Sequence, residues 1–242
     1  MKKIVTLAIL IIIGISSFGQ SAVDEGELMN LGEDTGTATT VIETQSPRTL
    51  SPLVAKQKAG ALDNPQIRNI RALGIINKHF GADITAFSAD FADLKNIYVN
   101  AKSLFLRGDY YNSYDQYLQC QAKSMELYQR AADFYKNESM KLLDQASAKV
   151  LDMEIEALVS DTPDEDKNRV TLAQGNLRIA FEYFNESDAD YKAKRYQDTI
   201  DNCQAAKYYA INALINLEKD PQKAASLEES FDKDIRDALG RL

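Results

Sequence analysis

The sequence feature that most constrains the fold is the stretch from Asp109 to Thr162, which contains neither glycine nor proline. It is rich in Ala, Leu, Met, Lys, Glu and Gln, the residue types that lose least free energy on entering a helix. As a single helix it would be roughly 75 Å long at 1.5 Å per residue, several times the usual length in globular proteins. The stretch therefore predicts an elongated all-α protein that braces or spans an assembly, and not a small closed catalytic pocket.

The N-terminus has the pattern of a secretory signal peptide. A basic start, Met-Lys-Lys, precedes an almost wholly apolar run over residues 4–15, and small residues follow the run. We place the cleavage after Gly19, so that residues 1–19 are the signal, with a cut after Ala22 as the second choice. The run is too short for a membrane-spanning helix, which needs about 20 residues. Because no cysteine lies near the cleavage region, we expect an exported protein without a lipid anchor and without membrane insertion once the signal is removed.

The composition narrows the classes of partner and of chemistry. The chain carries 28 basic and 36 acidic residues, a net charge of −8, whereas proteins that bind nucleic acid or anionic lipid need a basic footprint. An acidic chain fits a partner with a basic surface. There is one histidine and no glycine-rich phosphate loop, nucleophile elbow or metal-ligand spacing. We therefore predict a non-enzymatic protein with no catalytic, cofactor or metal site.

The rest of the chain divides into an arm and a series of helices. Residues 20–60 are rich in Gly, Thr and Pro and poor in periodic apolar residues, which predicts a flexible arm before an α-helical domain at 61–242. The first helix is expected to begin at Asn64-Pro65, a cap residue followed by proline, and to end at Gly81. No segment alternates as a strand would. The remaining helices are expected over residues 83–107, 109–160, 164–192, 196–219 and 224–239.

A weak internal repeat links two of the turns between these helices. The segments 101–110 and 189–196 both have a helix end, a tight polar turn and a tyrosine that opens the next helix. Such helix-turn-helix hairpins are typical of tetratricopeptide-like proteins, which stack them into binding surfaces. Two copies about 86 residues apart do not fit the period of 34 residues, so we interpret them as two antiparallel hairpins.

Tyrosines crowd the start of the long helix, beside the turn at Asp109. Tyrosine is common at protein interfaces because its ring is buried while its hydroxyl stays solvated. We predict that most of these rings pack on a neighbouring helix and that a partner surface includes Asp109, Tyr111 and Tyr114. Tyr111 is expected to point away from the packed face.

The only cysteines are Cys120 and Cys203. In an exported protein they could form a disulfide, but two cysteines do not make a disulfide framework. Two buried, inert thiols are the alternative, and the one we favour.

Two segments resemble a known family. The segment Asn64–Gly81 (NPQIRNIRALGIINKHFG), together with Arg107–Asn112 (RGDYYN), resembles the flagellar-coiling proteins of spirochaetes. This resemblance implies an exported helical protein on the periplasmic flagellum, which helps to coil the filament as part of its sheath. The implied partners are the filament core and sheath proteins, with further copies of the chain itself. The family has no catalytic motif whose residues could be carried over.

Two other functions fit the same sequence. The first is a periplasmic adaptor whose tetratricopeptide-like hairpins hold a protein or peptide partner. The second is an extracytoplasmic sensor bundle for a small molecule, which is less favoured because no membrane tether would relay its signal.

Overall fold

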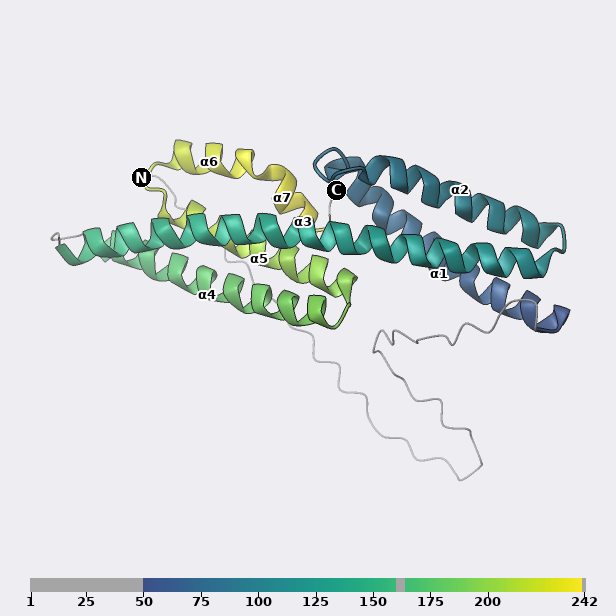
Figure 1. Cartoon of the computed structure of the whole chain (residues 1–242). Coiled ribbons are helices and arrows are strands. Elements are labelled where there is room, and N and C mark those ends of the chain that lie inside the picture. The colour runs from purple at the N-terminus through teal and green to yellow at the C-terminus, as the bar shows by residue number, and fades with distance from the viewer. Residues whose placement is uncertain (1–49, 160–163, 241–242) are drawn as a thin grey trace, which may run out of the picture. The chain divides into compact units, whose positions relative to one another are not determined.

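The computed structural model describes residues 50–159 and 164–240, and within them the chain forms seven α-helices and no strand (Figure 1). The predicted all-α class is confirmed. The predicted signal peptide and residues 20–49 of the predicted arm lie outside the described residues. The helices are α1 Pro52–Phe80, α2 Phe87–Leu106, α3 Tyr110–Val159, α4 Asp164–Lys192, α5 Tyr196–Leu217, α6 Pro221–Ser230 and α7 Asp232–Ala238.

The 50-residue helix α3 is the common support of α1, α2, α4 and α5. Helices α1 and α2 pack along its N-terminal half, and α4 and α5 pack along its C-terminal half (Figure 1). The two halves meet near Tyr135. The glycine- and proline-free stretch is thus one continuous helix, as predicted, and both groups of helices depend on it for their cores.

The first helix begins earlier than predicted. It starts at Pro52, because the Ser51 hydroxyl accepts a hydrogen bond from the Val54 amide (3.4 Å) and proline occupies the first helical position. Pro65 lies inside the helix, where its missing N–H removes one backbone hydrogen bond. Residues 52–60, assigned to the flexible arm, are therefore helical. Ala55 and Ala59 are buried, and Ala59 packs in one cluster with residues of α2 and α3.

Two further boundaries differ from the prediction. Helix α2 begins at Phe87 and not at residue 83, because the chain turns between the helices and Ala86 is left-handed, with φ of 57°. The expected last helix is two helices, α6 and α7, broken at Phe231. Phe231 is half-buried against the C-terminal core, and the break turns α7 back onto α5.

The two turns of the internal repeat have the same backbone geometry. Each is a Schellman motif, in which two amides return to carbonyls of the preceding helix and one residue is left-handed. The left-handed residues are Gly108 (φ 83°) and Lys194 (φ 61°). In both hairpins an aromatic residue before the turn meets the opening tyrosine edge-on, with ring centroids 5.4 Å apart for Phe105 and Tyr110 and 5.5 Å apart for Tyr191 and Tyr196. The amide-to-carbonyl pairs are Asp109 to Leu104, Gly108 to Phe105, Arg195 to Asp190 and Lys194 to Tyr191.

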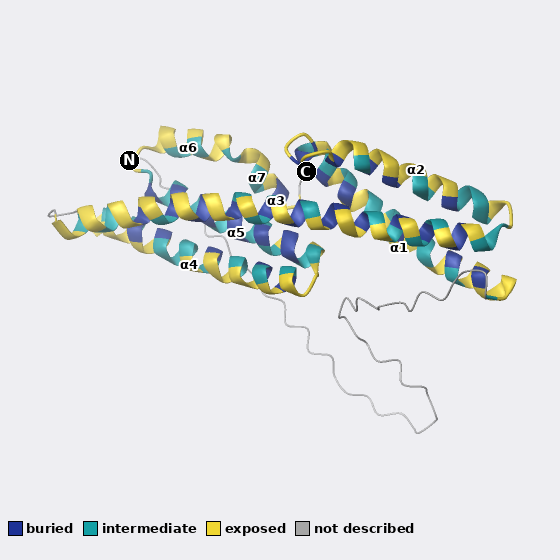
Figure 2. Ribbon diagram, viewed as in Figure 1, coloured by how far each residue is buried: buried dark blue, intermediate teal, exposed yellow. Residues whose placement is uncertain are grey.

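Buried residues recur along the whole length of α3, as the dark blue segments of its ribbon show (Figure 2). The core of the N-terminal half is aromatic, with Phe80, Phe87, Phe91, Tyr117 and Tyr128. The core of the C-terminal half is mainly alanine, leucine and valine, which permits α3, α4 and α5 to approach closely. Helix α6 contributes no buried residue to either core.

Candidate functional site

The predicted partner surface lies on the first turns of α3, but each of its residues already has a partner within the chain. The Asp109 carboxylate caps α3, accepting hydrogen bonds from the backbone N (3.4 Å) and side-chain Nδ2 (2.7 Å) of Asn112. The Tyr111 hydroxyl donates to the Leu50 carbonyl at 2.8 Å, so this half-buried residue does not point away from the packed face. Tyr114 is only 3% exposed. Its burial contradicts its assignment to a partner surface.

Tyr117 of α3 and Tyr98 of α2 hold three helices together through Asp63 of α1, a residue that no sequence motif marked. The Asp63 carboxylate accepts hydrogen bonds from the hydroxyls of Tyr117 (2.8 Å) and Tyr98 (2.9 Å) and from the Lys102 ammonium. Burial acts to raise the pKa of Asp63, but these three donors outweigh it and leave the pKa below its usual value. Burial, together with Asp63, raises the pKa of Tyr98 to about 12. The cluster is a tie between α1, α2 and α3.

The cysteines do not form a disulfide. Cys120 and Cys203 are both buried free thiols. The Ser139 hydroxyl of α3 donates to the Cys203 carbonyl (3.0 Å), which places Cys203 beside Ser139. Cys120 lies nineteen residues earlier on α3, roughly 28 Å along the axis, whereas bridged cysteines need Cα atoms within about 7 Å. Burial raises the pKa of Cys120 to about 11, as expected of an inert thiol.

A buried polar cluster fixes α7 to the middle of the molecule. Lys207 of α5 is 1% exposed, and its ammonium pairs with Asp234 of α7 and lies over the Tyr135 ring, 4.8 Å from the centroid. The Tyr135 hydroxyl donates to Asp237 of α7 at 2.7 Å. Burial raises the pKa of Asp237, and the Tyr135 hydrogen bond and nearby Lys207 offset this only in part. Because an unpaired buried charge is costly, Lys207 holds α7 strongly.

The last turns of α3 carry a second apolar face outside the core, which we call the α3 stripe: Leu151, Ile155, Leu158 and Val159. Their spacing of three and four residues places them on one side of the helix. They are 55%, 50%, 82% and 81% exposed, while the core-facing residues of the same turns include the buried Val150. The sequence carried this signal as a second apolar periodicity beside the core periodicity, and our prediction of a surface at Tyr111 and Tyr114 overlooked it.

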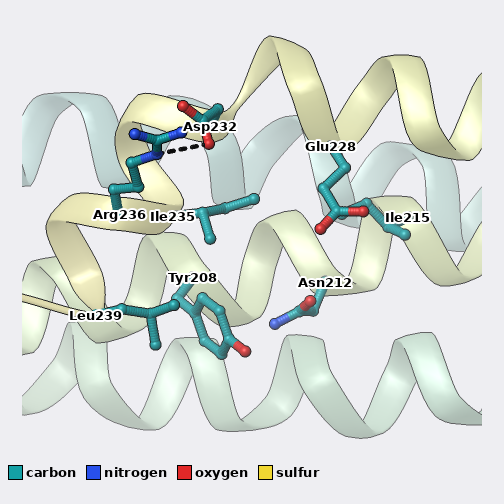
Figure 3. Close-up of a pocket in the computed structure, with 8 residues that line it drawn as sticks. All are labelled: Tyr208, Asn212, Ile215, Glu228, Asp232, Ile235, Arg236 and Leu239. Atoms are coloured by element: carbon teal, nitrogen blue, oxygen red, sulfur yellow. Dashed lines mark hydrogen bonds and ion pairs between the residues drawn. The ribbon is translucent and has the colours of Figure 1, made fainter. Parts of the chain in front are cut away.

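A groove of about 590 Å³ lies between α5 and the α6–α7 pair (Figure 3). Tyr208, Asn212 and Ile215 of α5 form one wall at helical spacing. The other wall consists of Glu228 on α6 with Asp232, Ile235, Arg236 and Leu239 on and beside α7. The groove exists because the chain breaks at Phe231 between α6 and α7. We expected one helix there, so no sequence pattern indicated a groove.

Within the described ranges the side chains form no group of three or more His, Cys, Asp and Glu residues that could hold a metal ion. None of the helices in these ranges combines the length and the apolar character needed to cross a membrane. The one histidine, His79, lies in the last turn of α1 with its Nε2 atom buried and without a hydrogen-bond partner. Comparison with known proteins finds no matching family model, curated protein or solved structure.

Proposed function

We propose that the chain is a non-enzymatic structural component of the sheath around a periplasmic flagellar filament. In this proposal it is exported, binds filament proteins through a helix face and promotes filament coiling. The resemblance of Asn64–Gly81 and Arg107–Asn112 to spirochaete flagellar-coiling proteins supports the location. The observation that carries the binding role is the α3 stripe, four large aliphatic residues that are at least half exposed on one face of a helix.

The α3 stripe is suited to binding because its position is fixed by packing on the opposite side of the helix. Val150 and the neighbouring buried residues of α3 lie against α4 and α5, so the helix is ordered before any partner arrives. A pre-ordered surface loses less conformational entropy on association than a flexible one. Contiguous exposed apolar residues are also unusual on monomeric soluble proteins and mark interaction sites.

The charges beside the α3 stripe indicate what kind of surface it would meet. Asp152, Glu154 and Glu156 lie on the same turns, and none of them forms an ion pair within the described residues. A partner with an apolar strip bordered by basic residues would complement them. Such an attraction weakens as salt is added.

The test is co-sedimentation with purified flagellar filaments and the curvature of filaments from a deletion strain that expresses variants. Leu151→Glu combined with Leu158→Glu should abolish co-sedimentation and coiling while leaving the Tm nearly unchanged, because both side chains are exposed. Leu106→Glu on α2 is the matched control, since Leu106 is 76% exposed and lies away from the α3 stripe. A wild-type chain that never co-sediments would discard the flagellar proposal.

The two turns of the internal repeat favour a second candidate, a periplasmic adaptor that holds a peptide. The α2–α3 and α4–α5 hairpins share the Schellman turn and the edge-on aromatic pair, and paired helical hairpins are the units of tetratricopeptide-like binding surfaces. An adaptor would be recovered with a soluble partner and not with filaments, so fractionation separates the two candidates.

A further inference from the structure

The groove between α5 and the α6–α7 pair combines an apolar surface with a carboxylate that has no partner among the described residues. Ile215, Ile235 and Leu239 provide aliphatic surface, and Figure 3 shows the Ile235 side chain directed from the α7 wall toward α5. Arg236 is already engaged by Asp232, with Nε 2.8 Å from Oδ1. Glu228 forms no ion pair or hydrogen bond through its side chain with any described residue.

The polar groups of the groove converge on one region. Figure 3 shows the Glu228 carboxylate directed from the α6 wall toward Asn212, with the Tyr208 hydroxyl beyond it on the α5 wall. The groove therefore offers a negative charge, an amide and a phenol hydroxyl above aliphatic side chains. A lysine or arginine side chain complements these groups, because its apolar stem can cover the aliphatic side chains while its cationic end pairs with the carboxylate and donates hydrogen bonds.

The two parts of the α6–α7 wall are held differently. Helix α7 is fixed to α5 and α3 by the buried Lys207–Asp234 pair and the Tyr135–Asp237 hydrogen bond. Helix α6 has no buried residue, and half-buried Leu227 and Phe231, which directly follows the helix, pack on the core. One side of the groove is thus pre-ordered while the Glu228 side can move, which suits the capture of a peptide over the capture of a rigid small molecule.

From these contacts we infer that the groove binds a basic amphipathic segment of a partner protein. A lysine or arginine of the segment pairs with Glu228, and its aliphatic residues cover Ile215, Ile235 and Leu239. The volume of about 590 Å³ accommodates a few side chains. The net charge of −8 attracts a basic segment and opposes a second copy of the chain. The inference deepens the proposed function by naming a site for the basic part of a partner.

The experiment is isothermal titration calorimetry of the full chain with a short acetylated peptide of leucine and lysine at helical periodicity. Glu228→Gln should weaken binding about three- to tenfold, since the charge pair sits in a partly enclosed groove. Glu229→Gln removes the same charge from the adjacent residue, which does not line the groove, and should leave the affinity unchanged. Ile235→Ala should also weaken binding, with circular dichroism to verify that the helices are intact.

Three results would overturn the inference. Equal weakening by Glu228→Gln and Glu229→Gln would mean diffuse attraction to an acidic surface. Spermidine binding as tightly as the peptide, with the same dependence on Glu228, would mean a simple cation site. Sedimentation that shows a wild-type dimer dissociated by Glu228→Gln would make a second copy the occupant. The experiment uses no filament, so its outcome is separate from that of the co-sedimentation test of the flagellar proposal.

Discussion

The α2–α3 and α4–α5 hairpins are built on the same turn but are covered differently. The first hairpin is covered by α1, a 29-residue helix that buries six residues, among them Leu73 and Phe80. The second packs against the C-terminal half of α3, and α6 and α7 add a partial cover that contacts mainly α5. These two helices have ten and seven residues, of which only Asp237 is buried. The same supersecondary unit thus belongs to a three-helix layer in each half, and only in the C-terminal half does a further pair of helices, α6 and α7, add a partial outer cover on α5.

This difference separates the part of the molecule that stabilises the fold from the part that presents surfaces. In the N-terminal half the polar groups are used internally, as when Asp63 accepts three hydrogen bonds from α2 and α3. In the C-terminal half the incomplete cover leaves the groove beside α5, and the α3 stripe lies beyond it on the last turns of α3. The groove and the α3 stripe therefore both lie in the half that the tyrosine pattern did not indicate.

The largest effect should come from proline in α3, which would reveal whether the two halves are one folding unit. Ala131 and Ala146 are both buried, one in each core. Ala131→Pro and Ala146→Pro should each cost ~3 kcal/mol or more, through a lost hydrogen bond and a ring clash. Ala→Gly at the same positions, which keeps the N–H, should cost about 1 kcal/mol. Because α3 runs through both cores, we expect a single thermal transition by circular dichroism for every variant. Two transitions would mean that the hairpins fold independently.

Helix periodicity was sufficient to predict most of the fold. The bounds of α3, α4 and α5 lie within two residues of the prediction, because long apolar-periodic segments bordered by Pro163, Gly108 and Pro221 leave few alternatives. The start of α1 was misplaced because Ser51-Pro52 and Asn64-Pro65 carry the same cap signal. Only the tertiary burial of Ala55 and Ala59 decides between them.

The surfaces were less predictable for a physical reason. Tyr114 and Leu158 each have a residue type and a spacing that fit a core or an interface, and the choice depends on which helix covers them. The pairing of Cys120 with Cys203 likewise depended on axial register, which spacing along the chain does not specify. Groups brought together from three helices, such as Lys207, Asp237 and Tyr135, left no local pattern at all.

Two carboxylates, Asp63 in the N-terminal half and Asp237 in the C-terminal half, should contribute pH dependences of stability with opposite signs. The folded-state pKa of Asp63 is lowered, so the stability that it contributes is present above the unfolded pKa and is lost as the pH falls through the folded pKa. The folded-state pKa of Asp237 is raised, so its charged form is a penalty that disappears as the pH falls through the folded pKa.

Replacing each aspartate by asparagine measures the sign of its contribution to the pH dependence of stability. Asp63→Asn should cost about 1.5–3 kcal/mol at neutral pH, the range for hydrogen bonds to a charged group, and its deficit relative to wild type should vanish in acid. The stability of Asp237→Asn relative to wild type should increase as the pH rises, because the wild type then carries the buried charge and the variant does not. The measurement is the Tm of each variant and of wild type between about pH 3 and pH 7. Deficits with the same pH slope in both variants would contradict the assigned environments.

The smallest effect concerns the left-handed position of the two turns, which holds glycine in one and lysine in the other. Gly108 and Lys194 occupy the same left-handed site, which costs a non-glycine residue roughly 1–2 kcal/mol. Lys194→Gly should relieve this strain and lose part of the gain to the greater entropy of the unfolded chain, leaving about 0.5–1 kcal/mol of stabilisation. Gly108→Ala should destabilise the fold by about 1 kcal/mol, the cost of a positive φ for alanine. No steric clash adds to this cost, because nothing lies within 4 Å of the added Cβ.

The measurement is urea denaturation of both variants. The control is Lys192→Gly, which places glycine in the last turn of α4 without changing the left-handed site. A Lys194→Gly variant less stable than wild type would mean that the second turn does not have the geometry of the first.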